Sequence, residues 1–422
     1  MFMSSSMVCS SRRTGVLKRV MQGLTLTLLG IAGTAGTAHA QNHPFGSHHQ
    51  AYHTSALRVS AGEAAADKAT SDFYWQWKSR YVEPGCQPDE YRIRASTGEA
   101  HVVSEGQGYG MLISVMIAGQ DPQARAIFDG LHRYSRRHPS QNNPDLMAWA
   151  QDDSCRDVLD HDSATDGDLD IAYALLLAHE QWGSGGAIDY ASEATRVLDA
   201  IAESNINPTT RLVNLGDWAP LTDDPTYSYA TRSSDWMLGH FRSFIGHPSA
   251  DWSRILTAHQ TLIETMQSRY ASSTGLLPDF IINTNTTPRP AFAEFLEAPH
   301  DGSYSWNASR VPWRLGIDAA ISGDTRSRSA VSRISSWIRG KTGGNPSNIR
   351  AGYTLDGRAI EPYNDMVFMA PFAVAATADS GGQAWLDSLW SQIVSTAPTE
   401  DYYGDTLKLL SMLCVSRNWM TP

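Results

Sequence analysis

The sequence predicts a single domain built almost entirely of α-helices. Apolar residues recur at helical spacing from residue 65 to the end of the chain, and convincing strands of alternating apolar and polar residues are scarce. No linker-like stretch rich in Pro, Gly or Ser follows residue 64. A chain of 422 residues could hold two or three domains, but helices of similar length throughout favour one all-α domain over residues 65–422.

The first 40 residues predict an export signal peptide. Four basic residues between Arg12 and Arg19 precede an apolar run from Leu24 to Ala32, and Ala38-His39-Ala40 is a small-x-small cleavage site. The apolar run is too short and too rich in Gly and Thr for a spanning helix. We therefore expect a secreted or periplasmic protein with no membrane anchor, and the export route stays open.

Residues 41–64 are polar and lack periodicity, so we expect a disordered N-terminal segment. Eleven helices are expected beyond it, separated by loops that contain Gly, Pro or Asn. In chain order they span residues 65–81, 104–118, 122–137, 168–181, 187–204, 236–246, 249–270, 313–322, 325–341, 366–378 and 382–397.

The cysteines and histidines give no indication of a metal site. Cys9 leaves with the signal peptide, so at most one disulfide can form among Cys86, Cys155 and Cys414, and we favour Cys86 with Cys155. No two cysteines have zinc-site spacing, and the local histidine cluster falls in the segment expected to be disordered. We expect no metal site.

The net charge of the chain argues against a nucleic-acid partner. It is −11, and removal of the signal peptide makes it four units more negative. An acidic surface does not neutralise phosphates. It suits neutral sugars or a cationic polymer such as chitosan, and charge alone does not separate these two.

Three acids, Asp166, Asp168 and Asp170, stand within five residues directly before an apolar helical run. Their carboxylates repel one another and compete for the positive end of the same helix, where each would gain about 0.3–1 kcal/mol. Because a fold needs one cap and not three, this crowding points to a site. The alternative is a helix start capped by Thr165 or Asp166, with the other acids solvated in the first turn.

Two long loops, residues 207–235 and 276–312, carry aromatic and acidic residues, and loops of this length are usually functional. The faces of sugar rings pack on aromatic planes, although most aromatics in any chain fill the core. The better candidates for sugar platforms stand among Gly, Asp and Asn in expected loops: Trp149, Trp218, Tyr227, Tyr229, Trp306, Tyr402 and Tyr403.

Three segments, residues 104–111, 164–182 and 306–314, together resemble glycoside hydrolase family 8. The pattern A-[ST]-D-[AG]-D-x-x-[IM]-A is met at every fixed position from Ala164, and residues 401–410 are similar to the family's C-terminal segment. The resemblance covers residues 70–415 and implies an (α/α)6 barrel. It also implies cleavage of β-1,4-linked glucans, mixed-linkage β-glucans, xylans or chitosan with inversion, which needs two carboxyl groups, a water and no cofactor.

The resemblance implies roles for two of the acids. Glu105 matches the family's general acid, whose pKa an apolar wall would raise. Asp166 matches the aspartate that holds the sugar at the cleavage point. Asp168 and Asp170 stay ambiguous, since one could bind substrate while the other holds the helix start or pairs with an arginine.

The general base departs from the commonest family pattern, because Asn307 stands where the base is often Asp. An amide has no usable basicity near neutral pH. A chitosanase- and lichenase-like branch of the family has this Asn and takes its base from a preceding loop, which here holds Glu294 and Glu297. We favour Glu297; residues 231–237 also resemble that branch. Asn307 would position the water or sugar, and Arg310 either orients a carboxylate or forms a purely structural ion pair.

The leading hypothesis is a secreted, inverting endo-glycosidase that hydrolyses β-1,4 bonds in a mixed-linkage or cellulose-type β-glucan and acts as a monomer. The expected substrate contacts come from Trp149, Trp218, Tyr227, Asn307, Arg310 and Tyr403. One alternative is a chitosanase with the same catalytic residues, which the loop acids Asp217, Asp223, Asp224 and Asp235 favour. The other is a non-catalytic carbohydrate-binding barrel, suggested by Asn307.

Overall fold

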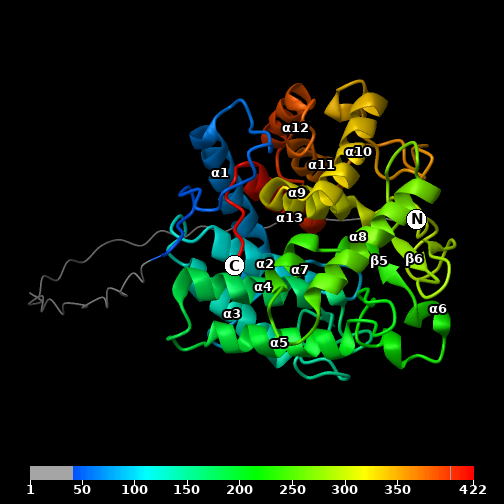
Figure 1. Cartoon of the computed structure of the whole chain (residues 1–422). Helices are drawn as coiled ribbons and strands as arrows, with labels where there is room; N and C mark the ends of the chain where they lie inside the picture. Colours follow the sequence, from blue (N-terminus) through cyan, green and yellow to red (C-terminus); the bar gives the residue numbers. More distant parts are fainter. Residues whose placement is uncertain (1–40, 400) are drawn as a thin grey trace, which may run out of the picture. The chain divides into compact units, whose positions relative to one another are not determined.

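The computed structural model describes residues 41–399 and 401–422, and the predicted signal peptide lies outside this part of the chain. The described residues are mostly helical (Figure 1). Their helices are α1 (Glu63–Tyr81), α2 (Ser104–Met116), α3 (Ala124–Arg137), α4 (Thr165–Trp182), α5 (Tyr190–Ser204), α6 (Pro225–Ser228), α7 (Leu238–Phe244), α8 (Trp252–Arg269), α9 (Val311–Ser322), α10 (Thr325–Thr342), α11 (Met366–Thr377), α12 (Gln383–Ser395) and α13 (Tyr402–Val415).

Each of the eleven expected helices is present, with ends that shift by a few residues. The sequence prediction missed the short α6 and the whole of α13. Helix α13 is capped by Asp401, whose side chain accepts the Gly404 N–H, and nearly all of its residues are buried. Its first turn, which holds Tyr402 and Tyr403 beside Asp401 and Gly404, is among the segments that the sequence predicted to be loops.

Six helices follow one another in contact: α2 with α4, α4 with α7, α7 with α9, α9 with α11, α11 with α13, and α13 with α2. Each of the six has a second partner, which is α3 for α2, α5 for α4, α8 for α7, α10 for α9, α12 for α11 and α1 for α13. In Figure 1, α3 and α5 lie below α2 and α4. Nearly all residues of α2 and α11 are buried, whereas their partners α3 and α12 are buried along one side only.

Helices α2 and α4 approach each other closely because two glycines face the contact. A Cβ on Gly108 would lie 2.8 Å from the Cβ of Asp170, and one on Gly167 would lie 2.7 Å from the carbonyl carbon of Ser104. A side chain at either glycine would therefore force the two helices apart. The glycines thus bring the first turn of α2, which carries Glu105, next to the first turn of α4, which carries Asp166.

Short antiparallel strands fix the loops between the helices. Strand β1 (Val82–Pro84) pairs with β2 (Tyr91–Ile93), and β3 (Val102–Val103) pairs with β4 (Ala150–Gln151). A three-stranded sheet has the order β5 (Thr231–Arg232), β6 (Phe280–Ile282), β7 (Arg289–Pro290). In the register of this sheet Arg232 faces Phe280, and Ile281 faces Pro290. Pairing of β5 with β6 therefore joins the long loop of residues 207–235 to that of residues 276–312.

The segment expected to be disordered is instead held against the helices, and residues 41–62 are called the N-terminal strap below. The reason is that the last carbonyl groups of a helix have no partner within the helix, and the strap supplies donors to several of them. In each of these hydrogen bonds the strap atom donates and the helix-end carbonyl accepts. The pairs are Asn42 N with Gln181 O, Phe45 N with Ala118 O, Tyr52 Oη with Cys414 O, His53 N with Ala320 O, and Leu57 N with Thr377 O. Such bonds to helix ends need no periodic pattern, so they could not be predicted from the sequence.

The expected disulfide is confirmed. Cys86 and Cys155 are bonded, with their Cα atoms 6.2 Å apart, and Cys414 is a buried free thiol. Among the helices of residues 41–399 and 401–422, none is long and apolar enough to cross a bilayer.

Candidate active site

A cleft of about 760 Å³ brings together the favoured catalytic residues and the expected substrate contacts. Its lining includes Glu105, Trp149, Asp166, Trp218, Tyr227, Glu297, Asn307, Arg310 and Tyr403. Glu105, Asp166 and Tyr403 stand in the first turns of α2, α4 and α13. The cleft therefore lies at the N-terminal ends of these helices, opposite the ends to which the strap binds.

Glu105 is the cleft acid best suited to give up a proton. Tyr402 donates its hydroxyl to Oε1 at 3.1 Å, and Arg310 Nη1 donates to Oε2 at 2.6 Å. Burial raises the pKa of Glu105 to about 7, even though Arg310 acts in the opposite direction. A carboxyl group with this pKa is protonated in a large fraction of molecules near neutral pH, as a general acid needs.

Asp166 lies beside Glu105 but has the opposite electrostatic environment. Burial alone would raise its pKa, but two arginines, Arg232 and Arg310, outweigh burial and lower the pKa to about 2. Arg310 Nη1 lies 2.8 Å from Oδ2, and Arg232 Nη2 lies 3.2 Å from Oδ1. Asp166 is therefore ionised at neutral pH and can accept hydrogen bonds or stabilise positive charge, but it cannot donate a proton.

Of the two candidate bases, only Glu297 lines the cleft. Asn307 donates from Nδ2 to Glu297 Oε2 at 2.7 Å, and Arg232 Nη1 lies 3.5 Å from Oε1. The Glu297 side chain is 44% exposed, so water can reach it. Glu294 is exposed and is absent from the cleft lining.

Arg232 is a site residue for which the sequence reasoning gave no role. Its guanidinium contacts Asp166, Glu297 and, through Nε at 3.1 Å, the buried Asp235. Residues 231–237, which include Arg232, resemble the chitosanase- and lichenase-like branch, but this resemblance assigned no role to the arginine. The available clue was an arginine and an aspartate, three residues apart, directly before the apolar run at Trp236.

Asp168 and Asp170 have structural roles, which resolves their ambiguity. Asp168 accepts the backbone N–H of Met147 at 3.1 Å and the side-chain amide of Asn205 at 3.0 Å, and burial raises its pKa to about 8. Asp170 pairs with Arg314 at 2.6 Å and with His240 at 2.8 Å. Neither residue lines the cleft. Of the three crowded acids, only Asp166 faces the cleft.

Six of the seven candidate sugar platforms line the cleft, and Tyr229 does not. The rings of Trp218 and Tyr227 lie 5.7 Å apart, and Tyr227 packs on Phe295 at 5.3 Å. Tyr403 donates its hydroxyl to the Trp306 carbonyl at 2.9 Å. Trp306 itself is 41% exposed, so its ring is free to meet a ligand.

Three of the four loop acids that favour a chitosanase are used by the fold. Asp217 is buried and accepts Ser140 Oγ at 2.5 Å and the Ser163 N–H at 2.8 Å. Asp224 caps α6, and Asp235 pairs with Arg232. None of these three, nor Asp223, lines the cleft, whereas Asp160 and Asp162 do.

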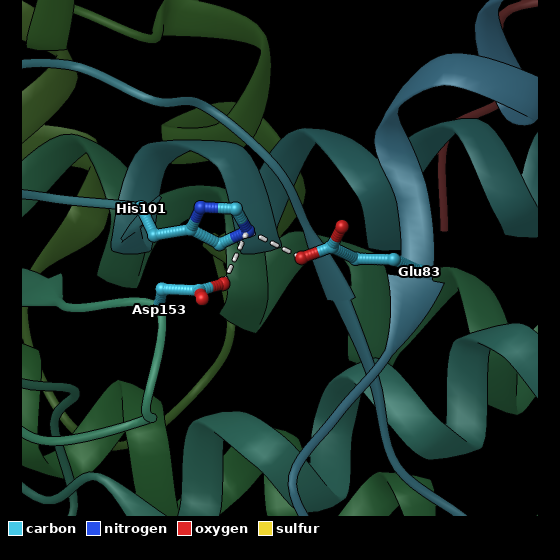
Figure 2. Close-up of side chains that lie close together, drawn as sticks. All are labelled: Glu83, His101 and Asp153. Carbon is cyan, nitrogen blue, oxygen red and sulfur yellow. Dashed lines mark hydrogen bonds and ion pairs between the residues drawn. The ribbon is translucent and has the colours of Figure 1, made fainter. Parts of the chain in front are cut away.

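A cluster of Glu83, His101 and Asp153 has donor atoms close enough to hold a metal ion (Figure 2). The charge of this cluster is already compensated by an arginine. His101 Nε2 bonds to Glu83 and lies 3.7 Å from Asp153 Oδ1. Arg92 lies 2.8 Å from Glu83 Oε1 and 3.2 Å from Asp153 Oδ1. A metal ion bound there would be repelled by the guanidinium. We therefore assign these residues to an ion-pair cluster, outside the cleft lining.

The comparisons with known proteins show the family of the chain. The family model described as glycosyl hydrolases family 8 matches residues 48–417. The chain belongs to this family. The match spans α1 to α13 and includes Glu105, Asp166 and the loop with Glu297.

Several relatives of this family 8 chain are similar over most of their length. A β-glucanase of Niallia circulans is 41% identical over 90% of this chain and 92% of its own. An endoglucanase of Bacillus sp. (strain KSM-330) is 38% identical over 85% of this chain and 78% of its own. The apo structure of a β-1,3-1,4-glucanase from Paenibacillus sp. X4 is 40% identical, with a TM-score of 0.87 over 91% of this chain and 100% of that one. The prediction of a glycoside hydrolase similar to endo-β-glucanases is confirmed.

Proposed function

We propose that this protein is an inverting endo-β-glucanase that hydrolyses β-1,4 bonds in a mixed-linkage or cellulose-type β-glucan. The observation that carries the proposal is one cleft holding Glu105, with a pKa raised by burial to about 7, together with the water-accessible Glu297. The β-glucanase of Niallia circulans and the β-1,3-1,4-glucanase of Paenibacillus sp. X4 support the substrate class.

The helices are proposed to form an (α/α)6 barrel. Support comes from the order of contacts α2, α4, α7, α9, α11, α13 and back to α2, each with one further helix packed on it. Such a ring brings the N-terminal ends of the inner helices to one face. Their positive helix ends then stabilise the carboxylates of that face.

Bond cleavage begins with the proton of Glu105. Glu105 gives this proton to the glycosidic oxygen as the bond from that oxygen to the anomeric carbon breaks, and the leaving sugar departs with a hydroxyl group. Positive charge then develops on the sugar ring. The ionised Asp166, next to Glu105, stabilises this charge and holds the ring by accepting its hydroxyl groups.

Glu297 is proposed to activate the water. As the water oxygen bonds to the anomeric carbon from the opposite face, its proton passes to the Glu297 carboxylate, so the configuration inverts. Asn307 and Arg232 contact the two oxygens of Glu297 and hold its orientation. Exchange of protons with solvent returns Glu105 to its acid form and Glu297 to its carboxylate form.

The protein is further proposed to act as a secreted or periplasmic monomer. The signal-peptide pattern of residues 1–40 supports export. Cleavage after Ala40 would leave the N-terminal strap intact, since the strap begins at Gln41. A β-glucan is preferred to chitosan because three of the four loop acids that favoured chitosan serve the fold and none of the four lines the cleft.

The test is release of reducing sugar by the protein lacking residues 1–40, from barley β-glucan, carboxymethylcellulose, xylan and chitosan. Wild type is expected to act on one or both β-glucans, and Glu105→Gln and Glu297→Gln to abolish this activity. Glu294→Gln is the matched control and should remain active. NMR of the first product should detect the α-anomer. Activity on chitosan alone would replace the proposed substrate, and retained activity in Glu297→Gln would remove Glu297 as the base.

A further inference from the structure

The loop that carries Glu297 is held by one buried carboxylate. Asp301 Oδ2 accepts the backbone N–H groups of Leu296 at 2.7 Å and Glu297 at 3.0 Å, and its Oδ1 accepts that of Ala298 at 2.9 Å. Asp301 is 1% exposed, whereas Leu296 and Glu297 are exposed. Since the side chains of this turn have little packing to fix them, the carboxylate sets the backbone position from which Glu297 extends.

Asp301 is itself anchored to the rest of the site. Its backbone carbonyl accepts the Phe280 N–H at 2.9 Å, and Phe280 is the β6 residue that faces Arg232 in the register of the sheet. Strand β6 therefore connects the Glu297 turn with Arg232, which contacts a Glu297 oxygen.

The partner of Glu297 is held in a similar way from the same strand. Asp279, directly before β6, accepts the N–H groups of Ser305 at 3.0 Å and Ala308 at 2.7 Å with Oδ1. This fixes the turn that presents Asn307, whose amide donates to Glu297. Two buried aspartates thus hold the two turns that bring Glu297 and Asn307 together.

We propose that Asp301 is a positioning residue for the general base, acting through the three N–H groups of the turn at residues 296–298. This inference rests on the proposed function, in which Glu297 activates the water. A water-activating carboxylate must stand within hydrogen-bond reach of its water, and a misplacement of about 1 Å can cost about 100-fold in rate. The exposed turn supplies no such precision by packing, and the carboxylate of Asp301 does.

The test is the variant Asp301→Asn. An amide has one acceptor oxygen, and its NH₂ group would face a backbone N–H that needs an acceptor. We expect kcat on β-glucan to fall about 10- to 100-fold with KM within about 2-fold, because the turn moves while the aromatic sugar contacts stay. Asp324→Asn is the matched control, since Asp324 also accepts two backbone N–H groups, at the start of α10. It should lower Tm and leave kcat unchanged.

An activated substrate separates the acid step from the base step. On a β-cellobioside with a dinitrophenolate leaving group, which needs no proton from the acid, Glu105→Gln should regain activity relative to wild type. Asp301→Asn and Glu297→Gln should remain impaired on it, and the double variant should be no slower than Glu297→Gln alone. A purely structural role for Asp301 would not produce this pattern.

The outcomes distinguish the two proposals. Activity of Glu297→Gln equal to wild type would overturn the base assignment, and the positioning role with it. Loss of activity in Glu297→Gln with wild-type kcat in a folded Asp301→Asn would overturn only the positioning role. Asp301→Ser, which keeps one acceptor oxygen, replaces Asp301→Asn if the latter does not fold, with the same expected loss of kcat at unchanged KM.

Discussion

Arg310 and Glu105 are joined by a 2.6 Å hydrogen bond from Nη1 to Oε2, although burial raises the pKa of Glu105 to about 7. The same nitrogen donates to Asp166 Oδ2 at 2.8 Å. One donor thus serves both acids. Burial dominates at Glu105, where the charge of Asp166 also raises the pKa, whereas Arg232 contacts Asp166 directly and adds a second positive charge that lowers the pKa of Asp166. Two neighbouring carboxyl groups are driven to opposite protonation states by their surroundings, as acid catalysis requires.

The pH dependence of activity should report Glu105. A general acid works in its protonated form, so kcat/KM should fall as pH rises through about 7, the pKa of Glu105, and approach a tenfold loss per pH unit above it. Initial rates on barley β-glucan from pH 5 to 10 measure this fall, which is the alkaline limb of the pH profile. On the dinitrophenyl β-cellobioside the limb should vanish. A limb that persists there would assign it to another group.

Replacing Arg310 should move the same limb to higher pH. In Arg310→Gln the positive charge that lowers the pKa of Glu105 is gone, while Asp166 still pairs with Arg232. Rates measured between pH 6 and 10 give the shift of the limb. Loss of one partner from a buried ion pair also destabilises the fold by about 3–5 kcal/mol, measurable by urea unfolding.

Arg314→Gln is the control for Arg310→Gln, because Arg314 pairs with the structural Asp170 at 2.6 Å. It should lose stability to a similar degree and keep the pH limb of wild type. A limb that moves equally in both variants would mean that Arg310 has no specific effect on Glu105.

Aromatic residues of the cleft should control affinity for the polymer. Trp218→Ala removes a ring that lines the cleft and packs on Tyr227, and we expect KM for β-glucan to rise about 2- to 10-fold, as for the loss of about 0.5–1.5 kcal/mol of aromatic contact. Trp75→Ala is the control, since Trp75 is 40% exposed on α1 outside the cleft lining. An unchanged KM in Trp218→Ala would remove Trp218 from the substrate contacts.

The N-terminal strap should stabilise the fold without touching catalysis. Tyr52→Phe removes the hydroxyl that donates to the Cys414 carbonyl at 3.0 Å, and we expect a loss of about 0.5–1.5 kcal/mol in the free energy of unfolding. Deleting residues 41–57 removes donors to several helix ends and should cost more. Thermal unfolding measures both, and kcat at 25 °C should equal that of wild type. An unchanged Tm after the deletion would show that the strap contributes nothing to stability.

The sequence predicted the helices well where each has one apolar side, as in α3 and α5. It failed for the strap, whose bonds to helix ends follow no period, and for α13, whose first turn of Asp, Tyr, Tyr and Gly predicted a loop. The motif residues Glu105 and Asp166 were found because their neighbours are glycines and apolar residues in a specific order. Arg232, Asp279 and Asp301 were missed because each acts through contacts with distant segments or with backbone N–H groups.

The helical class, the family and the acids around which the site is built could be read from the sequence, since these depend on residue types at short spacing. Which acids share a cleft depends on how distant segments fold together. The tertiary structure separated Asp166 from Asp168 and Asp170, gave Glu297 and not Glu294 a place beside Asn307, and set the pKa of Glu105 apart from that of Asp166. The physical reason is that burial and the positions of two arginines, more than 60 residues from either acid in the sequence, control these ionisations.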